Sequence, residues 1–384
     1  MAAAPDAPAP AHVHLDAAAG TPLHPAAREV LAAALERGYA DPRALHGPGR
    51  DARLLLDNAR EVVAECLGLS RDEVWFTSPL DAVQRGFLGL AAARRRVGAE
   101  LVLPAVEHAS VRHAARWWAD LRGGTVHELP VDRVGRVDVT AFAAAAAPEG
   151  VAAAALQLAN HEVGTTQPVD GLALPDGVPL FVDASSSLGT LDLPHGRWSA
   201  AAGHATSWGG PPGTGLLLVR RGTRWTNPFP GDPEPQDHGG ALPDVAGALA
   251  AAAALRATLD EREAVDARRR RLVDRIRAVA ATLPDTEVVG DPVDRLPHLV
   301  TFSCLYLSGE ALVRELDRAG FGVASGSACT ASTLEPSHVL AALGALTHGN
   351  VRISLGREVT DEDVERLTTV LPEVVARLRS EVWL

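Results

Sequence analysis

Lysine is absent from this 384-residue chain, so all 36 of its basic residues are arginines. An arginine guanidinium stays protonated in proteins and cannot form a Schiff base. A chain so rich in alanine and arginine is typical of biased codon usage, which accounts for most replacements of lysine by arginine. The sequence therefore excludes any mechanism that needs a lysine side chain.

Cysteine is scarce as well, because Cys66, Cys304 and Cys329 are the only three. Their spacing matches no metal site, and an odd number argues against a framework of disulfides. Such cysteine usage fits a reducing compartment, and we expect a cytoplasmic protein. Cys66 falls in an amphipathic segment and Cys304 in an apolar alternating one, so both are expected to pack in a core.

Long apolar runs are also missing. No stretch approaches the roughly 20 apolar residues that a membrane-spanning helix needs. The N-terminal sequence MAAAPDAPAPAHV lacks the basic start and apolar centre of a signal peptide, and we expect a flexible tail there. The net charge of −12 gives no support to nucleic-acid binding. We therefore expect neither a membrane nor a nucleic acid as a partner.

The length is sufficient for two domains with substantial cores. Hydrophobic spacing predicts helices at 25–38, 51–67, 246–283, 310–319 and 360–378. Apolar segments predict strands at 73–78, 100–103, 151–158, 179–183, 216–220 and 298–304. Four consecutive arginines, Arg268 to Arg271, are expected to form a solvated face of the long helix.

One stretch near the C-terminus carries a candidate nucleophile. Residues 323–336 read VASGSACTASTLEP and place Cys329 among small polar residues and a glycine. This composition predicts an exposed loop in which a substrate can reach the thiol. A nearby base or positive charge would lower the pKa of the thiol and make it a nucleophile. Farther along, residues 350–357 read NVRISLGR.

This C-terminal block resembles the cysteine desulfurases, which are pyridoxal-phosphate (PLP) enzymes of the class V aminotransferase fold. In that family a loop reading SGSACTSASLEPS carries the cysteine that forms a persulfide. A following R-x-S-L-G-R segment supplies the arginine that holds the substrate carboxylate. The matching positions here are Cys329 and Arg352. The resemblance covers the chain from about Val13 to the last predicted helix.

The resemblance implies an α/β protein with the PLP-transferase fold of type I. Its large domain, 14–250, would contain a mostly parallel seven-stranded sheet, and residues 1–13 and 251–384 would form a smaller α/β domain. The family resemblance also implies a dimer whose subunits share each site. The chain would pair with itself or with a lysine-bearing relative, and a sulfur-acceptor protein is a further implied partner.

Several positions resemble the family's contacts to the PLP ring. His108 matches the histidine that stacks on the ring and acts as acid and base. Asn160 matches an asparagine that hydrogen-bonds the ring oxygen, although His161 replaces the asparagine after it. Asp183 matches the aspartate that pairs with the ring nitrogen, and it follows a predicted strand, where open α/β sheets bind ligands. Ser186 replaces a glutamine that contacts the ring oxygen.

The lysine that holds PLP in the family is replaced. The family reads Ser-x-His-Lys, two residues and then Gly-Pro-x-Gly-x-Gly, whereas residues 203–215 read GHATSWGGPPGTG. Without gaps, Ser207 takes the lysine position, Thr206 the histidine position and His204 the serine position. Serine cannot form a Schiff base or act as the amine base. His204 is an alternative base, but we expect it to be structural.

The phosphate-binding residues of the family differ here too. A Gly-Ala-Thr that opens a helix and binds the phosphate is replaced by Pro79, Leu80 and Asp81. Proline has no N–H to donate, and Asp81 would place a carboxylate near a phosphate dianion. Ala241 replaces a threonine that reaches the partner subunit's phosphate. PLP would therefore bind at best non-covalently.

Three hypotheses follow. The first and favoured one is a catalytically silent or sulfur-relay protein, in which Cys329 accepts persulfide sulfur from elsewhere. The second is an active cysteine desulfurase that uses non-covalently bound PLP to release sulfur from L-cysteine, with His108 as a base. The third is other chemistry in a repurposed pocket, with or without PLP. No metal is expected.

Overall fold

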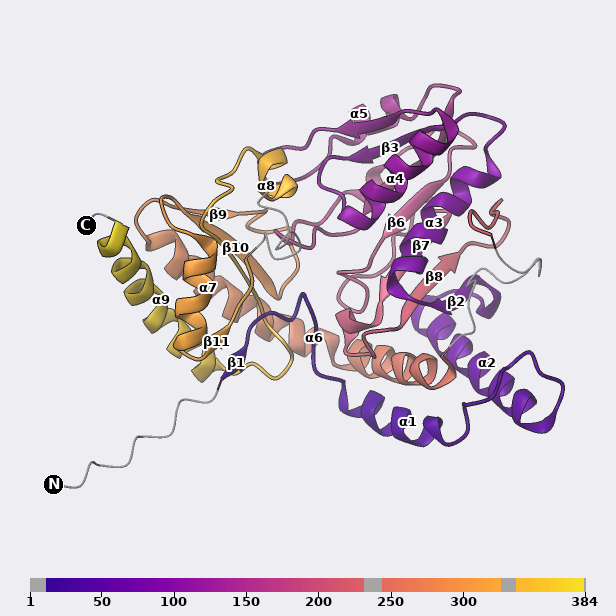
Figure 1. The fold of residues 1–384 in the computed structure, drawn as a ribbon, viewed down its shortest axis with the longest axis horizontal. Helices are drawn as coiled ribbons and strands as arrows, with labels where there is room; N and C mark the ends of the chain where they lie inside the picture. Colours follow the sequence, from indigo (N-terminus) through magenta and orange to yellow (C-terminus); the bar gives the residue numbers. More distant parts are fainter. Residues whose placement is uncertain (1–11, 231–243, 326–335, 383–384) are drawn as a thin grey trace.

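A seven-stranded sheet forms the centre of the larger part of the molecule (Figure 1). This computed structural model describes residues 12–230, 244–325 and 336–382. The strand order is β2-β8-β7-β6-β5-β3-β4, and β8 runs in the direction opposite to the other six strands of this sheet. The strands are β2 (Val74–Thr77), β3 (Glu100–Pro104), β4 (Val126–Leu129), β5 (Val151–Gln157), β6 (Leu180–Asp183), β7 (Ala200–His204) and β8 (Gly215–Val219). The predicted mostly parallel sheet is confirmed.

Helices cover both faces of this sheet because successive strand residues point to opposite sides. In β3, Leu101 and Leu103 pack with α3 (Pro79–Ala93) and α4 (Ala109–Arg122). Val102 between them packs in a second core on the other face. That core also contains residues of α1 (Pro25–Leu35), α2 (Gly47–Leu67), α5 (Val139–Ala145) and the first part of α6 (Val245–Thr282). The result is a three-layer α/β/α arrangement.

The remaining elements form a smaller α/β unit (Figure 1). Its three-stranded antiparallel sheet has the order β12-β10-β9, and β1 pairs in parallel with β11. The strands are β1 (Val13–His14), β9 (Thr286–Val289), β10 (Leu299–Cys304), β11 (Phe321–Gly322) and β12 (Asn350–Ser354). The helices are α7 (Gly309–Arg318), α8 (His338–Leu343) and α9 (Asp361–Val382). Leu15 and Cys304 are both buried in the core of this unit.

Helix α6 connects the two units without a break. Its N-terminal part, to Leu255, packs in the core of the large unit, whereas Leu272, Val273 and Ile276 pack in the core of the small one. The division at 14 and 251 stays a prediction, and α6 crosses its second boundary. Among the described residues, no helix is long and apolar enough to cross a membrane.

The prediction of a solvated face at Arg268 to Arg271 is wrong for three of the four arginines. Arg268 donates to the carbonyl of Arg357, and Arg270 donates to the carbonyls of Val293 and Arg295. Arg269 is largely buried and pairs with Asp266. The run falls where α6 passes between the two units, so only Arg271 is exposed.

Candidate functional site

The carboxyl ends of β3, β5, β6 and β7 meet at one edge of the large sheet, where open α/β sheets bind ligands. A cavity of about 360 Å³ lies there, a size suited to a small molecule. The cavity is lined by His108, Asp183, Ser186, His204, Thr206, Ser207 and Arg352, all of them residues singled out by sequence.

Asp183 supplies the negative charge of the cavity. It is the last residue of β6, is only 6% exposed, and accepts a hydrogen bond from the N–H of Ser185 at 3.0 Å. Glu107 lies deeper, and its Oε1 accepts the N–H of Gln157 at 2.5 Å. Burial, and then the charge of Asp183, raises the pKa of Glu107 to about 8. Glu107 is therefore mostly protonated at neutral pH.

Two histidine rings meet beside Asp183. The rings of His108 and His161 are 4.7 Å apart in an edge-to-face arrangement. The Nδ1 of His108, at the start of α4, accepts the N–H of Ser110 at 3.2 Å. Burial lowers the pKa of both histidines, and that of His161 falls well below its usual value. Both rings are therefore suited to accept a proton only transiently near neutral pH.

Asn160 does not line the cavity. Its Oδ1 accepts the N–H groups of Glu162 and Val163, each at 2.9 Å, and its Nδ2 donates to the carbonyl of Val106. The side chain is fully buried, and its Oδ1 and Nδ2 both bond to these backbone groups. These bonds order the turn that presents His161 to the cavity, and the cofactor contact predicted for Asn160 stays a prediction.

Ser207 lies in a short 3₁₀ turn, Ala205–Trp208, directly after β7. Its hydroxyl is 2.8 Å from the carbonyl of Leu188 and 2.9 Å from that of His204. The ring of His204 is itself fixed, since its Nε2 lies 3.0 Å from the carbonyl oxygen of Pro212. The hydroxyl of Ser207 is thus occupied by backbone carbonyls, and no basic side chain among the described residues bonds to it.

The N-terminus of α3 forms another part of the wall and offers few donors. Ser78 caps this helix by accepting the N–H of Asp81 at 3.2 Å, and its own hydroxyl donates to the carboxylate of Asp81. Pro79 has no N–H. Of the first three residues of α3, only Leu80 therefore has an N–H that is not used by the cap. A phosphate would meet one such donor and a nearby carboxylate.

Arg352 reaches the cavity from β12 of the small unit. One of its terminal nitrogens donates to Asp16 at 2.9 Å, and the other lies 3.3 Å from the carbonyl of His161. Asp16 was not predicted as a site residue, and its pairing with Arg352 joins positions 336 residues apart. A ligand carboxylate at Arg352 would share the guanidinium with Asp16.

Cys329 and Ala241 lie outside the described residues, so their predicted roles stay predictions. The described residues on either side of 326–335 are anchored beside the cavity. Ala324 exchanges two backbone hydrogen bonds with Arg352, at 3.2 and 2.7 Å. Ser337 donates to the carboxylate of Glu162 at 2.6 Å. Burial raises the pKa of Glu162 to about 7.

Comparison with known proteins decides the family. The profile of the class V aminotransferases matches residues 13–367. An IscS-like cysteine desulfurase of Mycobacterium tuberculosis is 37% identical over 384 residues, which cover 95% of this chain and 97% of that protein. The chain belongs to the cysteine desulfurase family of class V aminotransferases. Another member, a cysteine desulfurase of Cereibacter sphaeroides, is 34% identical and covers 96% of this chain and 97% of its own length.

Solved structures confirm the fold expected for the desulfurase family. A NifS-like protein superposes with a TM-score of 0.86 at 24% identity, covering 96% of this chain and all of that one. The apo structure of a cysteine desulfurase from Thermococcus onnurineus gives a TM-score of 0.82 at 21% identity, with 96% and 95% covered. At these identities the likeness supports the type I fold and no finer property.

The cysteine desulfurase family depends on PLP, and the residues of this cavity fit it only in part. Asp183 and His108 line the cavity, and their chemistry suits the nitrogen and one face of a pyridine ring. Ser207, which the sequence predicts at the position of the lysine, has an occupied hydroxyl, and the start of α3 is poor in donors. The residues present therefore do not fit covalently held PLP.

Proposed function

We propose that this desulfurase-family chain does not turn over L-cysteine and instead carries sulfur on Cys329. The observation that carries the proposal is the environment of Ser207, the residue predicted at the family's lysine position. Its hydroxyl lies within hydrogen-bond distance of two backbone carbonyls. Because the chain has no lysine at all, no neighbouring side chain can replace the lost amine. The protein would be catalytically silent toward L-cysteine and active only as a sulfur relay.

The relay step needs no cofactor. The thiolate of Cys329 would attack the terminal sulfur of a donor's persulfide. That sulfur–sulfur bond would break, the donor would leave as a thiolate, and a new persulfide would form on Cys329 without net oxidation or reduction. The described residues on the two sides of 326–335 bond to the cavity region, Ala324 to Arg352, which lines the cavity, and Ser337 to Glu162, which follows the lining residue His161. These contacts support the proposal that the thiol works near the cavity.

The partner in this proposal is a sulfur donor, and a lysine-bearing desulfurase is the simplest one. Such a relative would pair with this chain as a heterodimer, or a homodimer of this chain would exchange sulfur with it. A sulfur-acceptor protein would then receive the persulfide. The cytoplasm, where thiols stay reduced, suits such an exchange.

A second candidate keeps support from Asp183 and His108. These two residues line the cavity where the family binds the PLP ring. An active desulfurase would then hold PLP non-covalently and release sulfur from L-cysteine, with His108 as the base. The pKa of His108 is lowered by burial, so the ring is neutral and able to accept a proton at neutral pH.

Mass spectrometry of Cys329 separates the two candidates. The chain is mixed with a lysine-bearing cysteine desulfurase, PLP and L-cysteine, and is also incubated with PLP and L-cysteine alone. The relay predicts one added sulfur on Cys329 in the mixture and no sulfide release in the second sample. Cys329→Ser should abolish the added sulfur and Cys66→Ser should not. Sulfide release by the chain alone would favour the second candidate.

A further inference from the structure

One wall of the cavity is rich in hydrogen-bond donors. Arg269 of α6, His298 just before β10 and Arg352 of β12 all line it. The Nε atoms of both arginines and the Nδ1 of His298 are buried without a partner among the described residues. His298 makes no hydrogen bond in the described part of the chain through its other nitrogen either. We call these three side chains the donor wall.

Buried donors without acceptors are costly, so this wall suits a ligand that brings acceptors. Each guanidinium has five N–H donors and a permanent charge. Asp266 accepts only one of the donors of Arg269, through a long contact of 3.4 Å. Asp16 and the carbonyl of His161 accept from Arg352. The N–H groups of the donor wall therefore outnumber the acceptor atoms that the described residues offer them, most clearly at Arg269 and His298.

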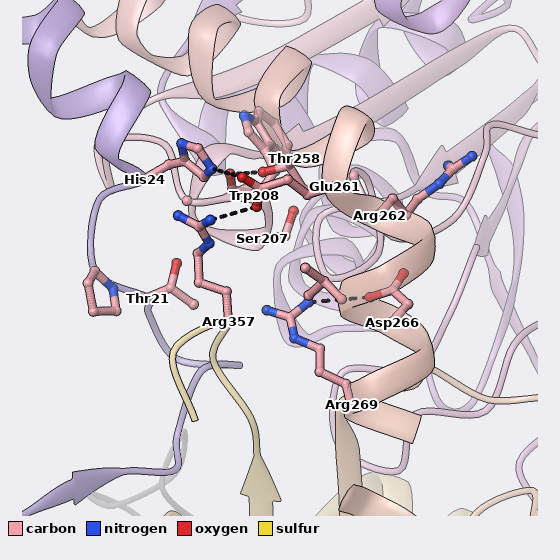
Figure 2. A pocket seen from close by; sticks show the side chains of 14 residues that line it. Thr21, His24, Ser207, Trp208, Thr258, Glu261, Arg262, Asp266, Arg269 and Arg357 are labelled. Atoms are coloured by element: carbon pink, nitrogen blue, oxygen red, sulfur yellow. Dashed lines mark hydrogen bonds and ion pairs between the residues drawn. The ribbon is translucent and has the colours of Figure 1, made fainter. Parts of the chain in front are cut away.

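Arg269 also lies beside the position of the missing lysine. A smaller cavity of about 40 Å³ adjoins the main one, and Thr21, Ser207 and Arg269 line both. Figure 2 shows this smaller cavity, with Arg269 paired to Asp266 on α6 and Ser207 nearby. The lining that Ser207 shares with Arg269 thus contains a positive charge, but as a guanidinium that cannot act as a nucleophile.

The electrostatics of His298 agree with this geometry. Burial, followed by the charges of Arg269, Arg352 and Arg295, lowers the pKa of His298 to about 3. The imidazole is therefore neutral at physiological pH and can donate one N–H without adding charge. A neutral donor flanked by guanidinium groups is suited to a carboxylate or phosphate oxygen.

We propose that the donor wall binds the oxyanion of a small molecule, a carboxylate or a phosphate, through Arg269, His298 and Arg352. Arg269 and His298 extend the position expected for a substrate carboxylate at Arg352 into a wider anion site. The ligand is held by charge-assisted hydrogen bonds and makes no covalent bond to the protein. The inference rests on the proposed function in one respect, because it assumes that Ser207 replaces a lysine whose longer side chain would occupy part of the cavity.

Calorimetric titration of the full-length chain tests this proposal without PLP or L-cysteine. Inorganic phosphate and malonate serve as separate probes, which distinguishes a phosphate ligand from a carboxylate ligand. At least one probe should bind the unmodified chain. Arg269→Gln should weaken that binding at least about tenfold, because it removes a charged donor. Arg271→Gln, an exposed change on the same helix, is the matched control and should leave binding unchanged.

Two further variants keep the test decisive if Arg269→Gln folds poorly. Asp266→Asn combined with Arg269→Gln removes the ion pair as a unit and leaves no unpaired charge. His298→Leu removes a neutral donor and leaves the net charge unchanged, and it should weaken binding as well. Binding of neither probe, or equal losses in the Arg269 and Arg271 variants, would overturn the proposal. Neither result would bear on sulfur transfer, which is measured separately.

Discussion

Glu107→Gln should remove a pH dependence of stability that the buried carboxyl imposes on the protein. Glu107 is fully buried, its Oε1 accepts the N–H of Gln157 at 2.5 Å, and its Oε2 has no partner among the described residues. Burial, together with the charge of Asp183, raises its pKa from 4.5 to about 8. Glutamine has nearly the same shape and can accept the same hydrogen bond, but it does not ionise.

The sign of the effect follows from proton linkage. The folded protein holds the proton of Glu107 more tightly than the unfolded chain does, so its contribution to stability is full below about pH 4.5 and is lost as pH rises through about 8. Each pKa unit corresponds to about 1.36 kcal/mol, so the interval corresponds to ~5 kcal/mol as an upper estimate. As the pH rises from about 4.5 to about 8, the free energy of unfolding of Glu107→Gln should therefore increase by a few kcal/mol relative to that of the unmodified protein.

Urea unfolding at several pH values between about 5 and 8, followed by tryptophan fluorescence, measures this difference. Burial also raises the pKa of Glu162, which gives a slope of the same sign in both proteins, so the difference isolates Glu107. Glu310→Gln, at a side chain 75% exposed on α7, is the control and should follow the unmodified protein. Parallel pH profiles for Glu107→Gln and the unmodified protein would refute the reasoning.

Two other predictions concern Ser337, at the start of α8, and His298, in the wall of the cavity. Ser337→Ala removes both a buried hydrogen bond to Glu162 and the N-cap of α8. The free energy of unfolding should therefore fall by about 1–3 kcal/mol in urea titrations. Ser380→Ala, at an exposed hydroxyl on α9, is the control and should change it little. The ring signals of His298 in NMR spectra should not titrate between about pH 5 and 8, since its pKa is about 3; a midpoint near 6.5 would contradict the buried, arginine-flanked position.

Most of the fold was predictable because its elements have strong local patterns. The helix predicted at 51–67 is present and begins four residues earlier, at Gly47, where the His46 ring accepts the N–H of Gly49. Strand β7 was not predicted. It reads AAAGH and has no β-branched or aromatic side chain, so its sequence lacks a strand signal. It forms because β6 and β8 pair with it on both sides.

The site was predictable only where motifs mark it. His108, Asp183, Ser207 and Arg352 were found from short motifs and do line one cavity. Asp16 could not be found in this way, because its link to Arg352 depends on the meeting of two distant segments.

The surroundings of Arg269 and Asn160 could not be predicted from the sequence. Arg269 was hidden in a run of four arginines that resembles a solvated surface, and only the passage of α6 between the units buries it. Asn160 matched a motif, and the sequence did not indicate that its Oδ1 also accepts two N–H groups of its own turn. Its predicted cofactor contact stays a prediction.

The most direct test of the central claim is a visible-absorption titration with PLP on the unmodified chain and on Ser207→Lys. Because the chain has no other lysine side chain, a Schiff base that forms in this variant and not in the unmodified chain, which has the same N-terminal amine, can be assigned to the introduced side chain. Arg271→Lys is the control for an exposed amine. The account predicts a Schiff-base band that survives dialysis in Ser207→Lys and in neither of the others. A PLP spectrum retained by the unmodified chain, with sulfide release on adding L-cysteine, would contradict it.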